Sequence, residues 1–156
     1  MSSGDDFDYE VPKMPDGALF VAADEPLLVF PSVKAAERWL EAIDVEDGIY
    51  PAAYGPKGEP FRIRSEGKYV VIDRTGEPDR PDALKLLLLR YLEAIDQPAD
   101  ASMALDELAA IVWVSESASW LEHDPYGDRF GSRIPGWGCV AFLIVAAVVA
   151  LYFAFR

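Results

Sequence analysis

Three carboxylates and two tyrosines near the middle of the chain have the residue types and the spacing to bind another molecule. They are Asp44, Glu46, Asp47, Tyr50 and Tyr54. The two tyrosines are four residues apart, so on a β-strand they would share one face beside the carboxylates. Tyrosine anchors many protein interfaces, and a rim of carboxylates attracts a basic surface. The pattern predicts a site for a basic protein, and the alternative is that both tyrosines belong to the core.

The residues needed for catalysis or for a metal centre are scarce. The chain has one histidine, His123, and one cysteine, Cys139, which is too few for a zinc site and makes any catalytic triad depend on His123. The acidic run before Gly48 is not a calcium loop, because its carboxylates do not alternate and no closing glutamate completes the frame. No glycine-rich loop opens a helix to hold a phosphate. We therefore expect a protein without enzymatic activity, metal or cofactor.

The charge of the chain is concentrated before its C-terminal segment. All 27 Asp and Glu lie within residues 1–128, against 11 of the 14 Lys and Arg, which gives this part a net charge of −16. Phosphate backbones repel such a surface, so we expect no nucleic-acid partner. A basic protein would instead be attracted to it and would meet it faster. The alternative is that the acidic surface serves solubility alone.

Residues 134–155 carry no charged side chain over 22 positions. An α-helix of about 20 apolar residues spans the hydrocarbon core of a bilayer, so this segment predicts a single transmembrane helix. Arg129 and Arg133 precede it, and residues 1–15 have no signal-peptide pattern, so we expect the acidic domain to face the cytoplasm at a bacterial inner membrane. The expected anchor residues are Trp137, Val140, Phe142, Ile144, Val148, Leu151 and Phe155.

Small residues recur along the same C-terminal segment. Ala146, Ala150 and Ala154 are spaced by four residues, which lets two membrane helices approach closely and would allow a weak homodimer. Alanine is common in such segments, so the alternative is that the lipid bilayer is the only partner of this helix.

Hydrophobic periodicity predicts an α+β domain over residues 18–123. Short apolar runs between turn residues are typical of antiparallel hairpins, and apolar positions three or four residues apart indicate helices. The predicted order is ββ-α-βββ-α-α, followed by the transmembrane helix, and successive hairpins favour an antiparallel sheet. The expected strands cover 19–23, 27–30, 49–54, 61–64 and 69–72, and the expected helices cover 33–43, 81–95 and 102–121.

Two segments flank the predicted domain. Residues 1–17 are acidic and aperiodic, which predicts a disordered arm, and residues 124–133 would form a juxtamembrane hinge. Large apolar residues on the expected strands and helices should form the core. They are Phe20, Phe30, Trp39, Phe61, Ile63, Val71, Leu84, Leu88 and Leu92.

The sequence LVFPSVKAAERWLEAIDVEDG over residues 28–48, followed by YPAAY over residues 50–54, resembles small bacterial immunity proteins that accompany secreted antibacterial toxins. The resemblance covers residues 18–95. It implies a non-enzymatic α+β protein that binds and neutralises a cognate toxin, and it carries over no binding residues. The membrane segment departs from soluble immunity proteins, so the alternative is a structural or regulatory subunit of an inner-membrane complex.

Overall fold

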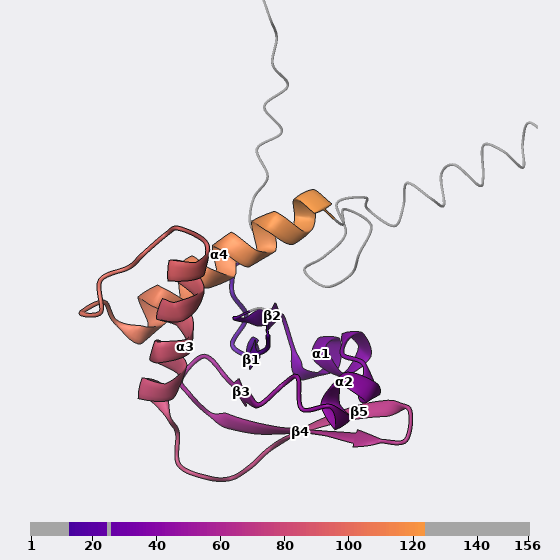
Figure 1. Cartoon of the computed structure of the whole chain (residues 1–156). Helices are drawn as coiled ribbons and strands as arrows, with labels where there is room; N and C mark the ends of the chain where they lie inside the picture. The colour runs from indigo at the N-terminus through magenta and orange to yellow at the C-terminus, as the bar shows by residue number, and fades with distance from the viewer. Residues whose placement is uncertain (1–12, 25, 124–156) are drawn as a thin grey trace, which may run out of the picture.

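A computed structural model describes residues 13–24 and 26–123 of the chain (Figure 1). Most of the expected acidic arm, the hinge at 124–133 and the predicted membrane segment at 134–155 lie outside the described residues, together with Cys139 and every expected anchor residue. Among the helices that are described, none has the length and apolar character needed to cross a membrane.

Five antiparallel strands form one sheet, which confirms the predicted α+β class. The sheet order is β2-β1-β3-β4-β5, and every neighbouring pair is antiparallel. Two hairpins, β1–β2 and β4–β5, are therefore joined through the short strand β3. The strands are β1 (Leu19–Ala22), β2 (Leu28–Phe30), β3 (Ala52–Tyr54), β4 (Pro60–Glu66) and β5 (Tyr69–Arg74).

The helix expected at 33–43 is two helices in the structure. α1 (Val33–Trp39) begins as predicted, because the Ser32 side chain accepts a hydrogen bond from the Ala35 N–H at 3.1 Å. Leu40 (φ −72°, ψ 142°) and Glu41 (φ −91°, ψ 136°) have extended backbones, so α2 (Ala42–Glu46) is a separate turn of helix. The interruption places Leu40 in the core.

The other two helices follow the sheet in the sequence. α3 (Pro81–Ala94) agrees with its predicted bounds, and α4 (Leu105–His123) begins three residues later than predicted. Gly58 lies directly against the start of α3. A side chain would not fit at this position, because a Cβ there would lie 2.6 Å from the Pro81 nitrogen. The Gly58 carbonyl also accepts a hydrogen bond from the Arg80 N–H at 2.7 Å, so the β3–β4 turn and the helix start are held together.

The β1–β2 hairpin is covered by helices on both faces (Figure 1). Successive residues of β1 alternate between two apolar clusters, so Phe20 packs with α3 and α4 whereas Leu19 packs with α1. The first cluster includes Phe20, Leu27, Val29, Tyr54, Leu84, Leu88, Leu92, Leu108, Val112 and Trp113. The second includes Leu19, Val21, Leu28, Phe30, Ala36, Leu40, Val70 and Ile72.

Five of the expected core residues are buried, and four are not. The buried ones are Phe20, Phe30, Leu84, Leu88 and Leu92. The prediction for Trp39 was wrong, because α1 ends there and the side chain is 42% exposed. Phe61, Ile63 and Val71 are only partly buried.

The error at Val71 has a structural cause in the sheet. Val70 and Ile72 are buried on the face that α1 and α2 cover. Val71 pairs with Arg64 on the opposite face of β4 and β5, and neither strand contributes to the cluster under α3 and α4. On that open face Arg64 forms an ion pair with Asp73 at 2.9 Å.

The edge of the sheet that β5 forms is protected by a side chain from α1. β5 is the last strand, so the hydrogen-bonding groups on one of its sides have no neighbouring strand. The Ile72 N–H donates to the Glu37 carboxylate at 2.9 Å, which satisfies one of these groups and holds α1 against the edge.

Replacing Glu37 tests this edge contact. Glu37→Ala should lower the free energy of unfolding by about 1 kcal/mol, because the Ile72 N–H loses its acceptor. Glu37→Gln keeps an acceptor oxygen and should recover most of the loss. Urea unfolding of the full chain in mild detergent, followed by circular dichroism, measures both. Equal losses in the two variants would assign the effect to charge rather than to the hydrogen bond.

Candidate functional site

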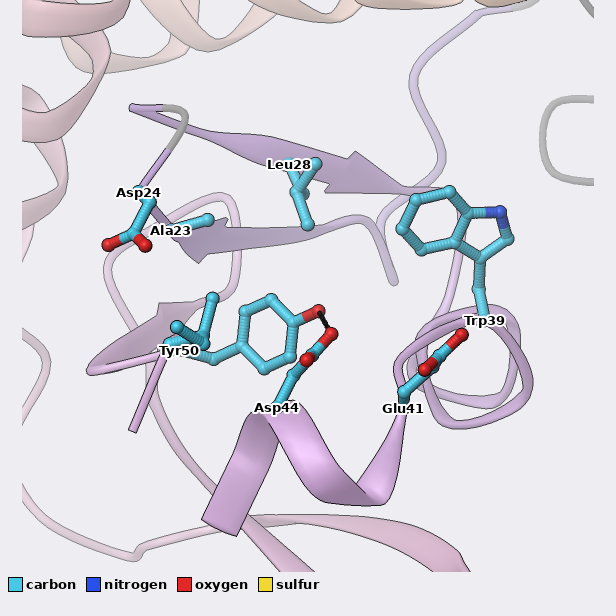
Figure 2. A pocket seen from close by; sticks show the side chains of 8 residues that line it. Ala23, Asp24, Leu28, Trp39, Glu41, Asp44 and Tyr50 are labelled. Atoms are coloured by element: carbon cyan, nitrogen blue, oxygen red, sulfur yellow. Dashed lines mark hydrogen bonds between the residues drawn. The ribbon is translucent and has the colours of Figure 1, made fainter. Parts of the chain in front are cut away.

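A surface pocket of about 500 Å³ lies beside the helix break, on the side of the β1–β2 hairpin that faces α1 and α2 (Figure 2). Three separate parts of the chain form its walls. The turn after β1 and strand β2 provide Ala23, Asp24 and Leu28, the α1–α2 segment provides Trp39, Glu41 and Asp44, and the approach to β3 provides Ile49 and Tyr50.

The helix break positions two of the lining residues. Trp39 is the last residue of α1, and its ring packs on Phe30 with the centroids 5.8 Å apart and the planes inclined by 60°. Glu41 is the residue that precedes α2, and its side chain makes no capping hydrogen bond. On a continuous helix, residues 39 and 41 would point in different directions. The extended backbone at residues 40–41 instead places both side chains beside the pocket.

Tyr50 points across the pocket toward α2 (Figure 2). Its hydroxyl donates a hydrogen bond to Asp44 Oδ2 at 3.1 Å. Burial of the phenol, the hydrogen bond to Asp44 and the charges of Asp44 and Glu41 together raise the pKa of Tyr50 to about 12. The hydroxyl is therefore a neutral donor at physiological pH, and it fixes the orientation of the Asp44 carboxylate.

The pocket has an unbalanced charge. Among the described residues that line it, Asp24, Glu41 and Asp44 are acidic and none is Lys or Arg. Across residues 13–24 and 26–123, no ion pair joins any of these three carboxylates to a basic side chain. A group of carboxylates attracts cations. With Trp39 and Tyr50 as aromatic walls, the arrangement suits an organic cation.

The structure brings together some of the predicted site residues. Asp44 and Tyr50 line the pocket and are hydrogen-bonded. Glu46 instead accepts a hydrogen bond from the Ser65 hydroxyl at 3.1 Å, and Asp47 is exposed where α2 ends. Tyr54 is 8% exposed and packs in the cluster under α3 and α4.

The two tyrosines do not share a face, because β3 begins at Ala52 and strand alternation does not extend back to Tyr50. Tyr50 packs against the cluster under α1, on the other side of the sheet from Tyr54. The alternative that both tyrosines belong to the core is therefore correct for Tyr54, whereas Tyr50 lines the pocket.

Sequence reasoning missed Asp24, Trp39 and Glu41 as lining residues. Asp24 belongs to a turn that the sequence does indicate, but nothing local shows that this turn faces α2. The helical spacing of Trp39 favours the core, and Glu41 falls within the single helix expected at 33–43. A helix break after position 39 is the signal that would have found both, and no proline or glycine marks it.

The size of the pocket bears on the kind of cation that fits it. Among the residues that the structure describes, no three His, Cys, Asp or Glu side chains form a group that could hold a metal ion. The pocket that the three carboxylates line has a volume of about 500 Å³, which is larger than an ion. An organic cation that reaches more than one of them fits this arrangement better.

Comparison with known proteins leaves the site to be interpreted from its own geometry. No family model, curated protein or solved structure matches this chain. The pocket, the charge of the domain and the exposed surfaces are accordingly the observations on which a function can be based.

The raised pKa of Tyr50 predicts a change in alkaline stability. Because the folded pKa lies above the ordinary value of 10.0, the associated stability is fully present below pH 10 and is lost as the pH rises toward 12. The stability difference between the natural chain and Tyr50→Phe should therefore shrink over this window. Denaturant unfolding at pH 9 and at pH 11.5 measures it. A difference that stays constant would contradict the hydrogen-bonded, partly buried phenol.

Proposed function

We propose that this chain is a membrane-tethered, non-enzymatic binding protein, most concretely an immunity protein that binds and neutralises a cognate basic toxin. The observation that carries the proposal is the pocket formed by Asp24, Glu41 and Asp44 with two aromatic walls, in which the described part of the chain places no basic residue. Unbalanced carboxylates at a hollow surface favour a cationic partner, and exposed aromatic rings supply the contact area on which interfaces depend.

The charge of the chain before its apolar segment supports the same partner. Residues 1–128 carry 27 acidic against 11 basic side chains. A field of this sign steers a basic protein toward the surface and raises its rate of association, with a strong dependence on ionic strength. Neutralising a toxin requires capture before the toxin reaches its target, so a fast association rate serves this function directly.

The apolar segment at 134–155 supplies the proposed tether. As a single transmembrane helix in a bacterial inner membrane, it would keep the acidic domain on the cytoplasmic side. Confinement to that surface raises the local concentration of the domain against a toxin that enters through the membrane. The stripe Ala146, Ala150 and Ala154 would permit a second copy to pack along the same helix.

A second candidate function is a structural or regulatory subunit of an inner-membrane complex. It is favoured by an apolar face of α4, where Ile111 is 36% and Val114 49% exposed. These residues, with Ala110 and Ala118, line a shallow hollow of about 530 Å³. A helix of another subunit would cover such a face, and the membrane segment would then make specific contacts rather than serve as a passive tether.

The tether predicts the behaviour of the chain in membrane fractions. Alkaline carbonate should leave the full chain in the pellet, because a spanning helix is held by its apolar surface rather than by charge. The chain ending at residue 133 should move to the supernatant. Release of the intact chain by carbonate would exclude the transmembrane segment.

Paired variants separate the two candidate functions. Co-expression with a basic toxin encoded beside the gene should protect cells, and Glu41→Gln with Asp44→Asn should reduce both protection and complex formation at least tenfold. Ile111→Ser with Val114→Ser should leave both unchanged. If the α4 variants lose function and the pocket variants keep it, the result would support a subunit of a membrane complex. Loss of function when an unrelated apolar helix replaces residues 134–155 would support the same conclusion. Growth protection without a complex would contradict direct neutralisation.

A further inference from the structure

The pocket has the dimensions of a side-chain or ligand site. Its volume of about 500 Å³ is within the range of roughly 300–1,000 Å³ that is typical of ligand pockets. Apolar groups from Ala23, Leu28 and Ile49 contribute to its lining, and the charged groups come from two segments, the turn after β1 and the α1–α2 segment. An occupant with an apolar stem and a polar, cationic end would match both kinds of surface.

The aromatic walls favour a flat cation. The Trp39 side chain, held by its contact with Phe30, stands at one side of the pocket, and Tyr50 extends across it (Figure 2). A cation placed over the face of a tryptophan is attracted by the ring quadrupole, and a planar guanidinium can also stack on the ring. Stacking on Trp39 therefore favours a guanidinium over an ammonium group, which is compact and strongly hydrated.

The carboxylates favour a cation with several donors. Glu41 precedes α2 and Asp44 lies within it, so both side chains reach the pocket from the same short segment (Figure 2). One oxygen of Asp44 already accepts from Tyr50, which fixes the position of that carboxylate. A guanidinium presents five N–H donors in a rigid plane and can contact two carboxylates at once, whereas an ammonium acts as a point charge.

We propose that the pocket binds one arginine side chain of the basic protein partner, with the guanidinium stacked against Trp39 and hydrogen-bonded to Glu41 and Asp44. The inference rests on the proposed function for the identity of the partner, but the chemistry of the pocket stands independently of it. The methylene stem of the arginine would lie along the apolar lining. Asp24 would attract the guanidinium through its negative charge without contacting it.

Titration of the full chain in mild detergent with blocked arginine, N-acetyl-arginine amide, tests the proposal. Calorimetry or ligand-observed NMR should detect saturable binding. Blocked citrulline, which has the same shape without the charge, should bind at least tenfold more weakly, and blocked lysine should bind several-fold more weakly. N-acetyl-arginine with a free α-carboxylate should bind less well than the blocked amide, because that carboxylate is repelled by the acidic pocket; tighter binding of the carboxylate form would overturn a protein side chain as the occupant.

Matched variants locate the binding. Glu41→Gln should weaken blocked-arginine binding at least tenfold, and it removes no capping contact from α2. Trp39→Leu should weaken arginine more than lysine, because stacking is lost while charge is kept. Glu93→Gln, which removes one charge from an exposed position on α3, should change nothing. Equal weakening by Glu41→Gln and Glu93→Gln would assign binding to diffuse charge and overturn the pocket.

The same measurements distinguish the proposal from the function on which it rests. Protection against the toxin with no saturable binding of blocked arginine would overturn the arginine pocket and leave the binding function intact. Arginine binding that Glu41→Gln abolishes, in a chain that forms no complex with the basic toxin, would support the pocket and overturn the proposed immunity function.

Discussion

Burial of the β1–β2 hairpin on both faces is the constraint on which the rest of the structure depends. Leu19, Phe20 and Val21 are consecutive and fully buried, and Val29 and Phe30 oppose them on β2. An antiparallel sheet commonly leaves one face in water, but here neither face of the hairpin can be left there. Fully burying one large apolar side chain contributes roughly 1.5–3 kcal/mol, so the hairpin requires a helical layer on each side.

The two layers have different characters, and the pocket follows from the smaller one. α3 and α4 cover the first face with long helices, and Tyr91 of α3 donates a hydrogen bond to Glu116 of α4, which with burial raises the pKa of Tyr91. The second face is covered by two short helices that are interrupted so that Leu40 can reach the core. Trp39 ends α1 and Glu41 precedes α2, so both lie at this interruption and line the pocket, which lies where the second layer ends.

The pocket gathers negative charge where the second layer ends. Asp24, Glu41 and Asp44 approach one space without a basic side chain of the described domain to compensate them. Elsewhere on the sheet, two exposed arginines are paired, Arg64 with Asp73 and Arg74 with Asp79 at 3.3 Å. A cationic ligand that binds only the folded chain would also stabilise the fold.

Local patterns predicted the order of the strands and helices, except for the division of the first helix into α1 and α2, and the bounds of α3, because turns and periodicity are properties of short segments. The exposure of Trp39, the burial of Val70 rather than Val71 and the opposite faces of Tyr50 and Tyr54 could not be predicted in this way. Each depends on which helix, distant in the sequence, covers which face of the sheet. Asp44 and Tyr50 were found from the sequence, whereas Asp24 joins them only through folding.

The most direct measurement is a crystal structure of the full chain grown with blocked arginine. We expect electron density for a guanidinium beside Trp39, within hydrogen-bonding distance of Glu41 and Asp44, with the Tyr50 hydroxyl still bonded to Asp44. A pocket without that density, in crystals where the arginine derivative occupies the apolar face of α4 around Ile111 and Val114 or no site at all, would contradict recognition of a basic partner through this pocket.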